Sequence, residues 1–245
     1  MVLVTEEPPK VRPRTPRLVR FLLVAAVVAI PVLLFPYLSL DPDRSRIPVS
    51  NDLHYAALVI HVLTAATALI LGVLQLIPRI RARRVVHRRL GRAFLLVGLV
   101  AFGLTGIPLA LVTPNGNVTR FGILVPAVGW LVCAALGWSA IRGGRLAAHR
   151  AWMIRTYALT FFALTTRMLV PLLLAVQMPF RDDRSPDAVR ALVESTIPYG
   201  QWLGWILDLA IAQYVIRRLE RTPTTGASPT RPGRARRTAG APTPR

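Results

Sequence analysis

Six long apolar segments alternate with shorter polar segments along the chain. They cover about residues 18–40, 53–78, 93–113, 120–141, 152–178 and 199–217. An α-helix needs roughly 20 mostly apolar residues to cross about 30 Å of hydrocarbon, and each segment is close to that length. The pattern therefore predicts an all-α bundle of six transmembrane helices over residues 18–217.

Polar segments flank this membrane domain on both sides. Residues 1–17 and 218–245 are rich in Pro and Arg, a composition typical of disorder. We therefore expect a disordered basic head and a disordered basic tail. Between the fifth and sixth helices, Ser185, Pro186 and Asp187 form a helix-start signal, and the apolar positions that follow predict a short helix on the membrane surface before residue 199.

Basic residues are distributed unevenly among the connecting segments. The chain carries a formal net charge of +20, and its arginines gather in the head, the tail and the segments 79–92 and 142–155. Acidic residues gather in 41–52 and 181–194, on the other side of a six-helix bundle. Since short cytoplasmic loops are enriched in Lys and Arg, both termini are predicted to be cytoplasmic in a multi-pass protein of the cytoplasmic membrane.

The large positive charge does not by itself indicate a nucleic-acid partner. The sequence contains no motif of aromatic and basic residues that would recognise a nucleic acid, so we predict no nucleic-acid partner. The lipid bilayer is the expected partner, and the dense basic segment 79–92 is a candidate contact for anionic lipid. The single cysteine, Cys133, excludes an internal disulfide framework.

Three ionisable residues are expected deep in the membrane. At a rise of about 1.5 Å per residue, Arg167 and Asp208 lie roughly 16 Å and 13 Å below the outer ends of the last two helices. An unpaired charge at mid-membrane costs roughly 2.5–3.5 kcal/mol on insertion scales. We therefore predict an Arg167–Asp208 ion pair, with His61 at a similar depth. This pair either fixes the register of the helices or forms a polar site for a proton, an ion or a head group.

Two other histidines are candidate haem ligands. A b-type haem in a bundle takes two histidines from different helices at one depth. His54 and His61 share one helix face about 10 Å apart and cannot hold one haem together. His87 and His149 lie on different helices near the cytoplasmic edge, beside arginines suited to haem propionates. The alternative is that both histidines cap helices or contact head groups. No metal-binding, P-loop or nucleophile motif is present, so no metal site is predicted.

The segments HRRLGR, residues 87–92, and HRAWMIR, residues 149–155, follow the histidine-bearing second helix. Together they resemble an uncharacterised bacterial family of predicted membrane proteins, domain of unknown function 2306. The resemblance covers roughly residues 50–215 and implies a multi-span membrane protein without an established activity or catalytic residue. In architecture alone, histidines at the ends of bundled helices also resemble carriers of the cytochrome b561 type.

Three classes of function remain open at this point. The first is a membrane redox component that binds haem or quinone, indicated by His87 and His149. In such a protein, a stripe of small residues on the fourth helix would face the flat ligand, whereas the alternative is that this stripe packs against another helix. The stripe comprises Gly122, Pro126, Gly129, Cys133 and Gly137. The second is a small-solute or proton-coupled transporter, indicated by His61, Arg167 and Asp208. The third is a non-enzymatic membrane scaffold for unknown protein partners.

Overall fold

A computed structural model describes residues 16–42, 45 and 49–221. Within them every regular element is helical. In chain order the elements are α1 (Arg17–Leu34), η1 (Phe35–Tyr37), α2 (Asp52–Leu76), α3 (Pro78–Ala82), α4 (Arg84–Gly98), η3 (Leu99–Gly106), α5 (Ile107–Leu111), α6 (Gly116–Arg142), α7 (Leu146–Gln177), η4 (Met178–Phe180) and α8 (Pro186–Arg221). The predicted disordered head and tail lie outside the described residues, except that Pro16 is the N-cap residue of α1, Arg17 begins α1 and residues 218–221 end α8.

Among the described residues, five helical segments are long and apolar enough to cross a membrane. They are Arg17–Tyr37, Asp52–Leu76, Arg84–Leu111, Gly116–Arg142 and Leu146–Phe180. The predicted all-α membrane bundle is thus confirmed. The helix α8 is not among the five, because Gln201, Asp208 and Gln213 interrupt its apolar character. The sixth crossing therefore stays a prediction.

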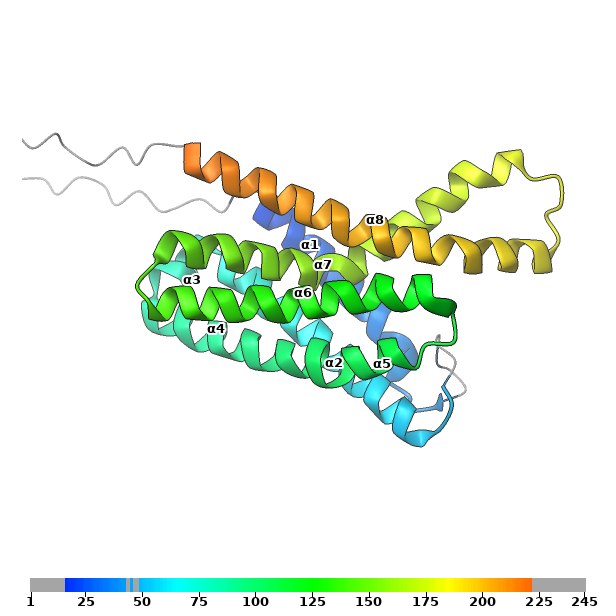
Figure 1. Ribbon diagram of the computed structural model, residues 1–245, viewed down its shortest axis with the longest axis horizontal. Coiled ribbons are helices and arrows are strands. Elements are labelled where there is room, and N and C mark those ends of the chain that lie inside the picture. Colours follow the sequence, from blue (N-terminus) through cyan, green and yellow to red (C-terminus); the bar gives the residue numbers. More distant parts are fainter. Residues whose placement is uncertain (1–15, 43–44, 46–48, 222–245) are drawn as a thin grey trace, which may run out of the picture.

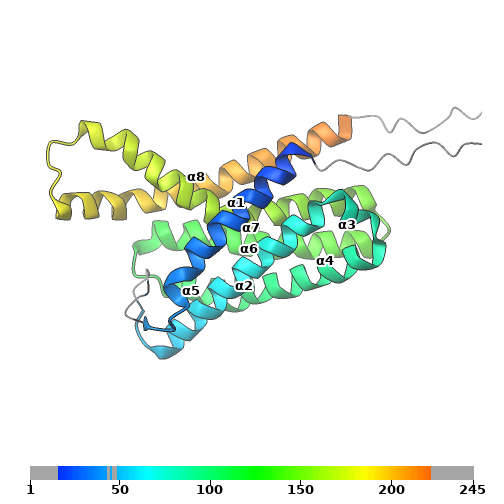
Figure 2. The ribbon, with the colours of Figure 1, turned by 180° about the vertical axis from the view of Figure 1, so that it is seen from behind.

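The helices α2, α4, α6 and α7 run side by side, and α1 packs against α2 on the outside of this group (Figures 1 and 2). The helix α8 packs along α7 and also contacts α6. The start of α1, the α3–α4 region, the α6–α7 turn and the end of α8 all lie towards one end of the bundle (Figures 1 and 2). We call it the basic end, because the arginine-rich segments 79–92 and 142–155 lie there.

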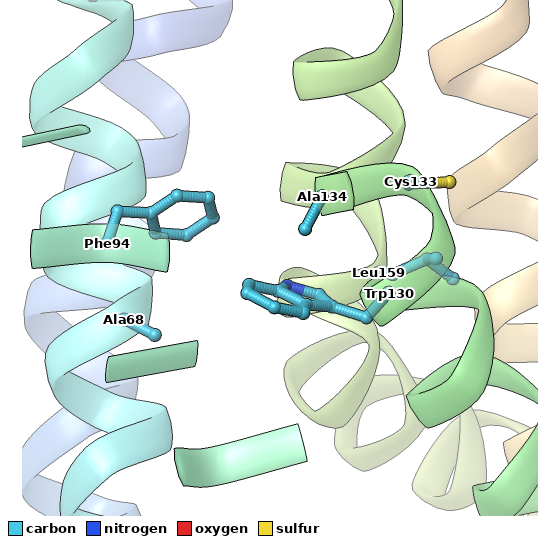
Figure 3. Close-up of a cluster of buried hydrophobic side chains, with 6 residues drawn as sticks. All are labelled: Ala68, Phe94, Trp130, Cys133, Ala134 and Leu159. Atoms are coloured by element: carbon cyan, nitrogen blue, oxygen red, sulfur yellow. The ribbon is translucent and has the colours of Figure 1, made fainter. Parts of the chain in front are cut away.

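An aromatic pair lies in the buried hydrophobic core of the bundle. Phe94 of α4 and Trp130 of α6 are each 1% exposed, and their rings meet edge to face with centroids 5.8 Å apart (Figure 3). The indole Nε1 of Trp130 donates to Thr160 Oγ1 of α7 at 2.9 Å. A hydrogen-bonded, buried Trp of this kind links α4, α6 and α7.

Two predicted connections are helical instead. The basic segment 79–92, expected as a loop, lies almost entirely in α3 and α4, since Arg is a strong helix former. The separate surface helix expected before residue 199 is wrong: it is the first part of α8, which continues through Pro198. Packing against α7 holds this part in place, with Thr196 Oγ1 accepting from Gln177 Nε2 at 3.2 Å.

Candidate functional site

His87 and His149 occupy equivalent places at the basic end. Each lies in the first turn of its helix, with its backbone N–H bonded to the carbonyl of the residue four positions earlier, Arg83 or Arg145. The helices α4 and α7 that carry them lie across the bundle from each other, because α2 contacts both of them and α6 contacts both α7 and η3, the continuation of α4.

His87 and His149 lie within range of an electrostatic interaction with each other, and Arg81 also acts on His87. His149 Nδ1 lies 2.8 Å from the carbonyl oxygen of Gly137. Since a carbonyl only accepts, Nδ1 of His149 carries a proton, and the neutral ring then has its lone pair on Nε2. His87 Nδ1 is buried and has no hydrogen-bond partner within the described part of the chain.

The elements around this pair are fixed by further hydrogen bonds. Gln75 at the end of α2 donates from Nε2 to the His87 carbonyl at 3.0 Å, which anchors the first turn of α4. Arg155, of the HRAWMIR segment, donates to Gln213 Oε1 of α8 at 2.6 Å and lies over the Trp152 ring at 4.8 Å from its centroid. Arg155 is thus engaged in packing, while Arg81 is exposed near His87.

His61 lies elsewhere, against the π-helical turn η3. Its Nδ1 is 2.8 Å from the Ala101 carbonyl oxygen and 3.3 Å from Thr105 Oγ1. This carbonyl again fixes the proton on Nδ1 and the lone pair on Nε2. A π-helical turn offers carbonyl oxygens outside the regular helical ladder and is frequent at functional sites. The sequence analysis missed this partner of His61, since no pattern marks a π-helical turn.

Arg167 and Asp208 differ in their exposure and in their hydrogen-bond partners. Asp208 is buried, and its Oδ1 accepts from Thr165 Oγ1 of α7 at 2.8 Å. Arg167 is exposed, donates from Nη1 to the Ala163 carbonyl at 3.0 Å and interacts electrostatically with His61. At about 100° per residue, positions 165 and 167 point roughly 160° apart around α7. The ion pair between Arg167 and Asp208 stays a prediction, and Thr165 is the partner that the sequence analysis missed.

The stripe of small residues on α6 is covered by other helices. A Cβ added at Gly122 would lie 3.2 Å from Gln201 Oε1 of α8. One added at Gly129 would lie 3.4 Å from a Leu159 methyl group of α7. One added at Gly137 would lie 2.9 Å from Met153 Sδ of α7. Of the two interpretations of this stripe, helix packing accounts for all three glycines.

The described residues contain no group of three or more His, Cys, Asp or Glu side chains arranged to hold a metal ion. The family model described as "Predicted membrane protein (DUF2306)" matches residues 58–216, which include His61, His87, His149, Arg167 and Asp208. No curated protein and no solved structure matches the chain.

Proposed function

The chain belongs to the DUF2306 family of predicted membrane proteins, and on this premise we propose that it is a membrane redox component that holds a b-type haem between His87 and His149. One observation carries the proposal: two histidines from helices across the bundle lie at the same end of it, within electrostatic range of each other. A b-type haem with two axial imidazoles requires histidines from different helices at one depth. The pairs His54–His61 and His61–Asp208 do not offer this.

The ring nitrogens of the pair suit axial ligation. His149 has its Nδ1–H bonded to a backbone carbonyl, which leaves Nε2 with a lone pair, and this is the usual arrangement of a metal-ligating histidine. His87 contributes a ring nitrogen that is buried without a partner among the described residues. The exposed guanidinium of Arg81 near His87 would meet a haem propionate. When bound, a haem would supply one-electron transfer between its ferric and ferrous states.

The absorbance spectrum of the purified protein tests this proposal. Expressed with a haem precursor and purified in mild detergent, the protein should show a Soret band and a reduced-minus-oxidised spectrum of a b-type cytochrome. His87→Ala and His149→Ala should each remove nearly all bound haem. His54→Ala is the matched control, because His54 lies at the other end of α2, where its Nδ1 accepts from Ser50 N, and it should keep the full spectrum.

A further variant tests the proposal if the alanine variants fold poorly. His149→Met retains an axial ligand for haem iron and should raise the reduction potential instead of abolishing binding. A folded wild-type protein without a Soret band would overturn the proposal. So would alanine variants that keep the wild-type spectrum, since the ligands would then be other residues.

We also propose that the basic end faces the cytoplasm and that the chain resides in the cytoplasmic membrane. The support is the gathering of arginine-rich segments at one end of the bundle (Figures 1 and 2), as the positive-inside rule requires. Green fluorescent protein fused after Arg83 should fluoresce, and alkaline phosphatase fused after Asn115 should be active. The reverse pattern would refute this orientation. A fusion after Arg221 tests the sixth crossing, since it should fluoresce only if α8 returns the chain to the cytoplasm.

A further inference from the structure

Unpaired polar atoms are concentrated on α6, α7 and α8, away from the proposed haem site. Nine buried side-chain N or O atoms of the described residues have no hydrogen-bond partner, and six of them belong to residues of these three helices. They are Thr119 Oγ1, Arg120 Nε, Thr166 Oγ1, Gln201 Oε1, Trp205 Nε1 and Asp208 Oδ2. Three of these residues are more than nine-tenths buried: Thr119 at 1% exposure, Asp208 at 7% and Gln201 at 9%.

The three atoms on α8 follow one face of this helix from the end opposite to the basic end towards the middle of the bundle. Gln201, Trp205 and Asp208 lie within roughly 60° of one another on the helix. Gln201 lies against Gly122 in the first turns of α6. One turn deeper, a Cβ on Gly204 would lie 2.7 Å from Thr166 Oγ1. Asp208 comes last, about 10 Å beyond Gln201 at 1.5 Å per residue.

A dry interface cannot readily hold so many unpaired groups. Leaving one buried polar group unsatisfied costs about 1–3 kcal/mol, so six together would cost roughly 6–18 kcal/mol, as much as the whole stability of a typical domain. Lipid offers no hydrogen bonds in return. Water molecules would relieve this cost, because the set mixes N–H donors, hydroxyls and carbonyl or carboxylate acceptors, and a buried water needs two to four such partners.

We propose that the interface of α6, α7 and α8 holds a chain of water molecules that reaches Asp208 from the end opposite to the basic end, and that Asp208 exchanges a proton with it. Thr165 holds Oδ1 of the carboxyl group at 2.8 Å, so Oδ2 is the oxygen that faces the water. The arrangement is a proton-accessible half-pathway that ends within the membrane. It is independent of the haem proposal, since none of its residues contacts His87 or His149 in the interactions described above.

Silver ions test access to the pathway, since they travel through water but not through lipid and bind thiols. In a Cys133→Ala background, the single cysteines Thr166→Cys and Gln201→Cys should be protected by Ag⁺ from later alkylation in denaturant. The matched controls are their neighbours Met168→Cys and Leu203→Cys, at nearly the same depths. Met168 and Leu203 are 59% and 47% exposed and face lipid, so these thiols should remain alkylated. Asp208 stays intact in all four variants.

The outcomes are decisive in both directions. Protection of Thr166→Cys and Gln201→Cys alone supports the pathway. Protection of none of the four, or of all four alike, overturns it, because the interface would then be dry or α8 would lie in water. Infrared spectroscopy of the wild-type protein tests the proposal if the cysteine variants fail to fold. The carboxylic C=O band of Asp208, identified by its loss in Asp208→Asn, should shift rapidly when acidified wild-type protein is moved from H₂O to D₂O. A band that does not shift would likewise overturn the proposal.

Discussion

Replacing Gly98 by alanine should destabilise the protein, although alanine is the better helix former. Gly98 of α4 lies directly against the indole ring of Trp130, and an added Cβ would collide with ring atoms Cζ2 and Cη2. Trp130 cannot easily move aside, because its ring stacks on Phe102 with centroids 4.9 Å apart and its Nε1 is held by Thr160. Overpacking a well-filled core typically costs about 1–3 kcal/mol.

Gly91→Ala is the matched control for this substitution. Gly91 lies two turns earlier on nearly the same face of α4, and an added Cβ would meet only the flexible Gln75 side chain at 3.6 Å. This variant should gain up to about 1 kcal/mol from helix propensity. Thermal unfolding in detergent, followed by circular dichroism, should therefore move in opposite directions for the two variants. Equal shifts would show that Gly98 is not in tight contact, and Gly98→Ala with Trp130→Phe should recover part of the loss.

The length and apolar character of the helices were predictable because the membrane demands both. Long apolar runs identify α1, α2, α4–α5, α6 and α7 without any knowledge of contacts. Their ends were less predictable. The start of α4 lies among arginines, which mark the cytoplasmic edge by their charge but also continue a helix well, so charge alone did not separate loop from helix. The separation expected before residue 199 is likewise absent, since α8 continues through Pro198 and Thr196 packs against Gln177 of α7.

The candidate sites were predictable to different degrees for a related reason. His87 and His149 follow from depth alone, because both lie beside the basic edge. The partner of Asp208 depends instead on the rotation of α7 about its axis, which sets Thr165 towards Asp208 of α8. Sequence gives the relative angles of residues on one helix, but the neighbour that each face meets is decided by packing. Likewise, the Ala101 carbonyl becomes available to His61 only because η3 is π-helical.

Replacing both Gly200 and Gly204 by leucine should release α8 from α7. These glycines are four residues apart on α8, the spacing that lets two helices approach closely in a membrane. A Cβ at Gly200 would collide with the Val170 side chain, and one at Gly204 would lie 2.7 Å from Thr166 Oγ1. At about 1–3 kcal/mol for each overpacked site, the combined loss is roughly 2–6 kcal/mol, enough to undo the docking of one helix.

Hydrogen exchange measured by mass spectrometry should detect this release as faster exchange of the α8 amides, with α2 and α4 unchanged. Ala210→Leu is the control, because Ala210 lies on the exposed face of α8 and added bulk there meets no helix. The Thr165–Asp208 hydrogen bond would be lost in the double variant, so the Asp208 carboxyl group would lose its fixed orientation as well. Exchange that speeds up throughout the bundle would instead mean that α8 is an integral part of one cooperative unit, and unchanged exchange would mean that α7 and α8 are not in close contact at these glycines.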